Sequence, residues 1–297
     1  MYKNSKKIIV NKEKNMENKL YFGTAGFGGL EYPSTNPTAD ACLEINKIGL
    51  DALEIEFVRQ IYLKNNSQEK LLEIKKKAET NNIKLSIHAP YFINLNSKDK
   101  LKLQNSVTRI IDSLNIGQTI GANILVFHIG YFMGEDKKKV MENVCEQIAY
   151  IQEKFNTKNK QIKLGPELTG KKTQIGSLEE LFYLYDKFGK KFIFPVIDFA
   201  HQHARENGYF KNTKNIDLFF SQLKSYPEIF QNMHIHMSGI NYTLKGERNH
   251  LMLENSDLPY KKILEKLKEN KTNGVIICES PDTVGDALLM KKIYEKL

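Results

Sequence analysis

The chain has 297 residues, of which 41% are hydrophobic and 27% are charged, and its formal net charge is +9. This balance is typical of a globular protein with a substantial core, and the lack of any run of ~20 apolar residues excludes a membrane-spanning chain. The three cysteines stand in no paired spacing, so we expect neither a disulfide scaffold nor a thiolate metal cluster, and with no secretory leader we expect a cytoplasmic protein.

The N-terminal segment differs from the rest of the chain. Residues 1–19 contain six lysines and two glutamates and show no apolar periodicity beyond residues 8–10. We therefore predict a disordered basic arm over residues 1–19 and a single folded catalytic domain over residues 20–297. The positive charge that remains on the folded domain is modest, so it indicates a polyanionic partner only weakly.

Short β-rich runs alternate with longer segments of helical periodicity from residue 20 onward. The predicted strands cover residues 20–23, 52–57, 84–88, 124–128, 162–167, 192–198, 233–236 and 275–279. The predicted helices cover residues 39–48, 68–80, 101–120, 137–155, 177–188, 216–223, 260–268 and 284–297. This alternation favours one (β/α)8 TIM barrel, an α/β fold, with an open doubly wound sheet as the alternative. The barrel is preferred because the segment GTAGFGG after the first strand lacks the G-x-G-x-x-G spacing of a dinucleotide-binding loop.

Imidazole and carboxylate side chains stand at the ends of several predicted strands. They are His88, His128, Glu167, Asp198 followed by His201, His234 with His236, and Glu279. The carboxyl ends of all barrel strands open onto one face, so these groups are expected to share one basin. Clustered carboxylates repel one another, and divalent cations relieve that repulsion. Mixed imidazole and carboxylate ligation suits zinc, with manganese or iron as alternatives.

Each of these residues also has an ordinary structural explanation. A single strand-end histidine is more often a hydrogen-bonded structural residue, and Asp198 could cap a helix that begins after it. Strand alternation sends His234 and His236 to the same side, and we favour His234 as the ligand and His236 as its orienting neighbour or an alternative ligand. His203 is expected in a loop or on the surface.

A polar loop is expected over residues 245–251, after the seventh strand. Its Glu247 and His250 either close a further metal site or belong to a solvated loop.

The chain from residue 20 onward resembles endonuclease IV, the zinc-dependent apurinic/apyrimidinic endonucleases built on a xylose-isomerase-like barrel. The matching stretches are GTAG at 23–26, HAPYFINL at 88–95, LVFHIG at 125–130, PELTG at 166–170, IDFAH at 197–201, MHIH at 233–236 and CESPD at 278–282. Their order and spacing agree over essentially the whole folded part. The glutamate, aspartate, histidine and glutamate set alone is shared with sugar isomerases of the same barrel.

The resemblance implies three zinc ions in each chain, with manganese as an alternative at one site. In the implied assignment the first ion is held by His88 and His128, and Glu167 bridges it to the second. Asp198, His234 and Glu279 complete the second site.

The resemblance places the third ion on His201 with an acid and a histidine from the loop after the seventh strand. The family commonly has Asp-x-His in that loop, whereas this chain has Glu247 and His250 separated by two residues. Either this longer spacing reaches the ion, or His236 substitutes, or the third site is weak.

The resemblance also implies hydrolysis of the phosphodiester on the 5′ side of abasic sites in double-stranded DNA, by a monomeric enzyme of base excision repair. Glu279 or Glu167 is expected to orient or deprotonate the attacking water. Tyr91 and Phe92 match the pair that the family inserts into the duplex, and Arg59 and Gln60 resemble the other wedge. Ordinary packing at the barrel rim is the alternative for Tyr91 and Phe92.

Two other functions fit parts of the pattern. A sugar isomerase or epimerase of the same barrel would use one or two divalent ions on Glu167, Asp198, a histidine and Glu279, but would not need His88, His128 and His201 together as ligands. A DNA-binding barrel without catalysis is supported only by the altered loop of the third site.

Overall fold

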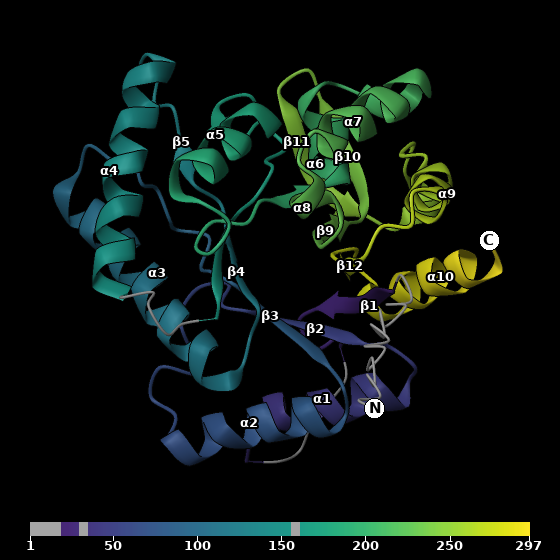
Figure 1. Ribbon diagram of the computed structural model, residues 1–297, viewed down its shortest axis with the longest axis horizontal. Coiled ribbons are helices and arrows are strands. Elements are labelled where there is room, and N and C mark those ends of the chain that lie inside the picture. Colours follow the sequence, from purple (N-terminus) through teal and green to yellow (C-terminus); the bar gives the residue numbers. More distant parts are fainter. Residues whose placement is uncertain (1–18, 30–34, 156–160) are drawn as a thin grey trace, which may run out of the picture.

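The computed structural model describes residues 19–29, 35–155 and 161–297, so the predicted arm lies outside the described residues except for Lys19. Eight parallel strands form one sheet in the order β6-β4-β3-β2-β1-β12-β9-β8. They are β1 Leu20–Ala25, β2 Ala52–Glu56, β3 Lys84–His88, β4 Ile124–Phe127, β6 Lys163–Pro166, β8 Val196–Asp198, β9 Met233–Met237 and β12 Gly274–Cys278. Figure 1 shows these strands as a central ring.

The ring is nearly closed. The first strand β1 pairs with the last, β12, from Leu20 opposite Gly274 to Thr24 opposite Cys278. Between the two end strands of the sheet, β6 and β8, two parallel bridges join Leu164 to Ile193 and Glu167 to Val196. The predicted TIM barrel is therefore confirmed, and the open doubly wound alternative is wrong.

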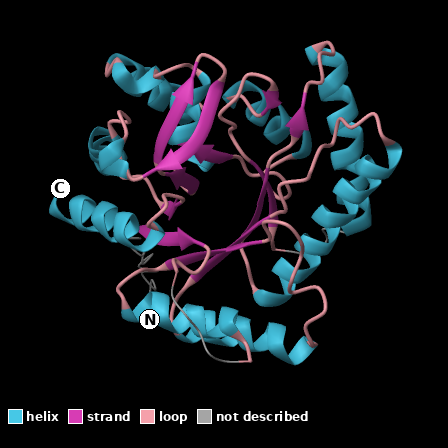
Figure 2. Ribbon diagram, turned by 180° about the vertical axis from the view of Figure 1, so that it is seen from behind, coloured by secondary structure: helices cyan, strands magenta, loops and turns pink. Residues whose placement is uncertain are grey.

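Helices surround the strands on the outside (Figure 2). They are α1 Pro37–Lys47, α2 Gln68–Thr80, α3 Lys100–Ile120, α4 Lys137–Phe155, α5 Leu178–Phe188, α6 Phe199–Arg205, α7 Lys214–Lys224, α8 Pro227–Phe230, α9 Tyr260–Glu269 and α10 Thr283–Lys296. Local signals fix several ends: Ser177 and Glu180 form a capping box on α5, and Gly121 ends α3 at a φ of 79°. No helix of the described ranges is long and apolar enough to cross a membrane.

The described residues form four further short strands beside the barrel. β5 Gly130–Tyr131 pairs with β7 Gln174–Ile175, and β10 Gly239–Thr243 pairs with β11 Gly246–Leu251 in an antiparallel hairpin. The predicted polar loop over residues 245–251 is thus wrong, because residues 246–251 form the second strand of that hairpin. The strand predicted over residues 192–198 is also shorter, since only Val196–Asp198 is regular.

His203 does not lie in a surface loop as predicted. It is fully buried on α6, where its Nε2 lies 3.0 Å from the carboxylate of Asp257 and its Nδ1 accepts a hydrogen bond from the backbone N–H of Phe210. Burial lowers the pKa of His203, so it is a structural imidazole that ties α6 to the following turn.

Candidate metal centre

The predicted site residues converge at the carboxyl ends of the barrel strands. His88 ends β3, Asp198 ends β8 and His236 lies near the end of β9, while His128, Glu167 and Glu279 each follow directly on the end of a strand. Their side chains form three groups whose nitrogen and oxygen atoms are close enough within each group to hold a metal ion. The groups are contiguous, because Glu167 belongs to two of them and its Oε1 atom lies 3.2 Å from His201 Nδ1 of the third.

The first group is His88, His128 and Glu167. The Oε2 atom of Glu167 lies 3.2 Å from His88 Nε2 and 2.9 Å from His128 Nε2. Glu167 is fully buried, whereas His128 is partly exposed at the mouth of the barrel. This is the set that the sequence predicts for the first ion.

The second group is Glu167, Asp198, His236 and Glu279. His236 Nδ1 lies 3.2 Å from Glu167 Oε1 and 3.3 Å from Glu279 Oε1. The predicted set contains His234 in place of His236, and the structure does not bring His234 into this group. Both side chains point inward from β9, but His234 lies two residues, ~6.6 Å, farther from the carboxyl end of the strand.

The third group is His201, Glu247 and His250. His201 Nε2 lies 3.5 Å from Glu247 Oε2, and the rings of His201 and His250 are 5.6 Å apart. In the hairpin, Asn241 pairs with Asn249 and Tyr242 pairs with Glu247, so Arg248 is an extra residue in a β-bulge. A one-residue bulge reverses the alternation of side chains, so Glu247 and His250 reach the same ion-sized space despite two intervening residues.

A close backbone approach positions the third group. The backbone N–H of Glu247 donates to the carbonyl of Gly170, the residue that follows Glu167 by three positions. A Cβ atom on Gly170 would lie 2.7 Å from the Cβ of Glu247, so only glycine permits the hairpin to lie this close.

Backbone carbonyls fix the tautomers of three histidines. Nδ1 lies 2.8 Å from the Ala89 carbonyl in His88, 2.9 Å from the Leu168 carbonyl in His201 and 2.8 Å from the Glu279 carbonyl in His250. A carbonyl oxygen only accepts, so each Nδ1 carries the proton and each Nε2 lone pair is left for a metal ion.

The charges of the basin call for cations. Burial raises the pKa of Asp198 to about 7, with His201 lowering it and Glu279 and Glu167 raising it further. Burial also opposes ionisation of Glu167, yet the imidazoles of His128 and His236 hold its pKa well below the ordinary range. Burial opposes ionisation of Glu279 in the same way, and His236 holds its pKa at about 2. Without another cation, protonated imidazoles must balance these carboxylates.

The donor set fits divalent metal ions. Asp198 Oδ2 and Glu279 Oε2 are fully buried and have no hydrogen-bond partner among the described residues. Such oxygens are costly unless they bind a cation. Neutral imidazole nitrogens together with carboxylate oxygens are ligands that zinc accepts.

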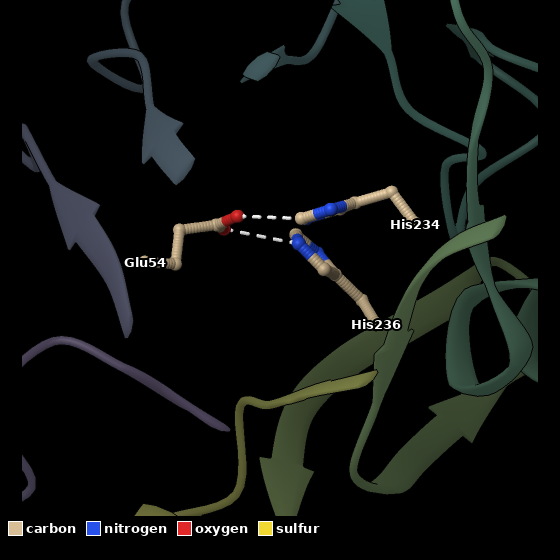
Figure 3. A group of neighbouring side chains, drawn as sticks. All are labelled: Glu54, His234 and His236. Atoms are coloured by element: carbon tan, nitrogen blue, oxygen red, sulfur yellow. Dashed lines mark hydrogen bonds and ion pairs between the residues drawn. The ribbon is translucent and has the colours of Figure 1, made fainter. Parts of the chain in front are cut away.

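Sequence reasoning missed Glu54, a buried residue on β2. Its carboxylate lies inside the barrel against His234 and His236 (Figure 3). The strand sequence ALEIE contains the signal, because Glu54 stands between the buried apolar residues Leu53 and Ile55 and a buried carboxylate requires a polar partner.

The predicted DNA-contacting residues lie at the same mouth. Tyr91 and Phe92 are 52% and 65% exposed, and the Tyr91 ring lies 5.8 Å from that of His88. The backbone N–H of Tyr91 donates to the carbonyl of Val58, which places the loop carrying the exposed Arg59 and Gln60 beside it.

The chain is similar to known proteins over almost its whole length. Residues 42–294 match the family model described as xylose isomerase-like TIM barrel. An uncharacterised protein of Methanocaldococcus jannaschii is 36% identical over 95% of this chain and 100% of that protein. A probable endonuclease 4 of Mycoplasma genitalium is 32% identical over 44% of this chain and 45% of that protein.

Solved structures share the fold at low sequence identity. The crystal structure of endonuclease IV from Thermus thermophilus superimposes with a TM-score of 0.71 at 18% identity, covering 93% of this chain and 100% of that one. A D-tagatose 3-epimerase-like protein gives a TM-score of 0.68 at 21% identity, covering 93% and 96%. The resemblance to endonuclease IV seen in the motifs is therefore confirmed in both sequence and fold, and the chain belongs to the xylose isomerase-like TIM barrel family.

Proposed function

We propose that the chain is a zinc-dependent endonuclease that hydrolyses the phosphodiester 5′ to abasic sites in double-stranded DNA. The observation that carries this proposal is the third ligand group, His201, Glu247 and His250, next to the two groups around Glu167. Three contiguous groups suit three ions, with manganese as an alternative at one of them. The exposed Tyr91 and Phe92 at the mouth supply the surface that an opened duplex requires.

The side chains have separate roles in this proposal. Divalent ions held by the three groups would neutralise negative charge on the phosphodiester and lower the pKa of an attacking water. Glu279, with its Oε2 atom unpartnered among the described residues, orients or deprotonates that water, and Glu167 holds the first two ligand groups together. Tyr91 and Phe92 fill the space of the displaced nucleotide, and Arg59 and Gln60 contact the opposite side of the opened duplex.

An incision assay tests the proposal. A 5′-labelled duplex with one tetrahydrofuran abasic analogue is incubated with the purified protein and zinc or manganese. We expect a shortened labelled strand that a polymerase can extend, since cleavage on the 5′ side leaves a 3′-hydroxyl. A chelator is expected to abolish the product, and the intact duplex is the control. A lack of incision with either metal supplied would contradict the proposal.

The Glu279→Gln variant separates chemistry from binding. We expect it to bind the abasic duplex as the unmodified protein does while incision falls by about 100-fold or more, the range for loss of a positioned general base. Full activity in this variant would refute the role of Glu279.

A sugar epimerase is the second candidate, because the group of Glu167, Asp198, His236 and Glu279 alone meets the needs of that reaction. Metal analysis discriminates between the two functions. More than two tightly held ions per chain favour the nuclease, whereas one or two ions together with turnover of a ketose favour the epimerase.

A further inference from the structure

Of the five histidines in the three ligand groups, His236 is oriented differently from His88, His201 and His250. In His88, His201 and His250 it is Nδ1 that lies against a backbone carbonyl, and Nε2 is left for the metal ion. In His236 the ring is reversed, because Nδ1 faces Glu167 and Glu279. A neutral His236 that binds an ion through Nδ1 must carry its proton on Nε2, and that proton needs an acceptor.

No backbone carbonyl of the described residues serves as that acceptor. His236 lies on a central strand, paired on one side with Asp198 of β8 and on the other with Ile277 of β12, so the neighbouring carbonyls belong to the sheet. The atom next to Nε2 is Glu54 Oε1, at 3.0 Å (Figure 3). Both atoms are completely buried, and neither has a hydrogen-bond partner elsewhere in the described chain. Each is thus the available partner of the other.

The other oxygen of Glu54 is held from two sides. Ser86 Oγ donates to Oε2 at 2.7 Å, and His234 Nε2 lies 3.0 Å from the same atom. Ser86 pairs with Glu54 across β2 and β3, so the contact follows from strand register. With Oε2 fixed in this way, Oε1 is aimed at His236.

We propose that Glu54 is a positioning residue, which accepts the Nε2 proton of His236 so that the Nδ1 lone pair faces the second ligand group, and that His234 holds Glu54 in place. This assigns His234 to the support of the centre instead of to its ligands. The proposal rests on the proposed function only in taking His236 as a metal ligand.

A fourth metal ion between Glu54, His234 and His236 is the competing explanation, since their ligand atoms also lie close together. The surroundings disfavour it. His234 borders a cavity of about 470 Å³ at the opposite end of the barrel from the ligand groups, and that cavity is lined by Lys19, Lys84 and Lys163 and by no carboxylate of the described residues. Three ammonium groups repel an entering cation and favour an unmetallated carboxylate.

Zinc binding by variants tests the proposal without any DNA. Glu54→Ala, Glu54→Gln and the matched control Glu56→Gln are titrated against a chromophoric chelator. Glu56 is an acidic residue two positions along the same strand, and it hydrogen-bonds no histidine in the part of the chain that is described. It therefore reports the loss of a nearby negative charge alone.

We expect Glu54→Ala to lower the affinity for one zinc ion per chain by about 10- to 100-fold, the usual effect of removing the partner of a ligating histidine. Glu54→Gln keeps an acceptor oxygen and should weaken that ion less, and it also serves if the alanine variant fails to fold. Glu56→Gln should change the affinity by less than about threefold. Unchanged zinc binding in Glu54→Ala, or equal losses in the Glu54 and Glu56 variants, would overturn the proposal.

Two further readouts separate positioning from the alternatives. Nitrogen-15 NMR of the histidine rings should show His236 protonated on Nε2 in the zinc-loaded protein, and that proton should exchange faster with solvent in Glu54→Ala. The zinc content of His234→Asn should equal that of the unmodified protein. Loss of one whole ion beyond those of the three ligand groups would identify a fourth metal site and refute the proposal. A negative incision assay leaves all of these outcomes unaffected.

Discussion

Asp198 carries out two tasks with its two oxygens, and substitutions can separate them. Oδ1 accepts the backbone N–H of His201 at 2.6 Å and so caps helix α6. Oδ2 is buried with Glu167, His236 and Glu279; it has no hydrogen-bond partner among the described residues and lies 3.2 Å from His201 Nδ1. Asp198→Asn keeps an oxygen for the cap but removes the charge, whereas Asp198→Ala removes both.

The expected free energies of unfolding follow from this division. Loss of the cap costs about 1 kcal/mol, so without metal Asp198→Ala should be less stable than Asp198→Asn by that amount. Burial raises the pKa of Asp198 to about 7, which means that its ionised form is unfavourable in the metal-free protein. The neutral Asn variant should therefore be at least as stable without metal, because asparagine caps helices as well as aspartate does.

Saturating zinc is expected to change the order of the three proteins in free energy of unfolding. Loss of a ligand that lowers the affinity for one zinc ion by about 100-fold removes about 2.7 kcal/mol of the stabilisation provided by saturating zinc. Both variants should show this deficit, and it should be of similar size in the two because both lack the ligand oxygen.

The assay is urea unfolding followed by circular dichroism, with a chelator and with excess zinc, for the three proteins. If Asp198→Asn gains as much stability from zinc as the unmodified protein does, Oδ2 is not a ligand. If Asp198→Asn and Asp198→Ala lose the same stability without metal, the capping argument fails.

Three other outcomes are expected. Changing Tyr91 and Phe92 together to alanine should weaken binding to an abasic duplex by about tenfold or more while changing the free energy of unfolding by less than about 1 kcal/mol, as gel shifts and urea curves would measure, because both rings are exposed. Gly170→Ala places a Cβ atom 2.7 Å from that of Glu247, so metal analysis should find about one zinc ion fewer per chain, and an unchanged zinc content would contradict the third ligand group. At pH 8 a thiol reagent should label none of the cysteines in the folded protein and all of them in denaturant. The reason is that burial raises the pKa of each thiol, to about 12 in two of them. Fast labelling of any cysteine before unfolding would show that the pocket around its thiol opens. The cysteines are Cys42, Cys145 and Cys278.

The barrel and most of its ligand groups could be predicted from the sequence because both depend on short-range patterns. Alternation of apolar strands with amphipathic helices identifies the elements, and helices over residues 68–80 and 137–155 match α2 and α4 in full. Once the fold is a barrel, a residue that ends a strand must lie at the mouth, so the convergence of His88, Glu167 and Asp198 follows without coordinates.

The third ligand group could not be settled in the same way. Whether Glu247 and His250 reach one ion depends on a single unpaired residue in the hairpin, and a bulge is a property of two paired strands. The segment GERNHL has no apolar alternation and resembles a loop in isolation. Only the pairing with β10 reveals that the extra residue restores the common orientation.

The sequence favours His234 for the second ligand group, whereas the structure places His236 there, and this difference has another cause. Strand alternation specifies the side to which a residue points, but not its depth along the barrel axis, and both histidines share one side. Depth is set by the register with β8 and β12, in which His236 lies level with Asp198. The partner at the deeper level, Glu54, comes from a strand 180 residues away in the sequence.

The deeper polar layer changes how the stability of this barrel must be counted. Most TIM barrels fill their axis with branched apolar side chains, whereas here Glu54, Ser86 and His236 are fully buried at its centre. A buried polar group without a partner costs about 1–3 kcal/mol, so this layer is tolerable only because its members supply one another with partners. Removing one member leaves the others unsatisfied, while the apolar alternative requires several simultaneous changes. The same contacts fix the orientation of His236, because Glu54 Oε1 lies 3.0 Å from its Nε2 atom.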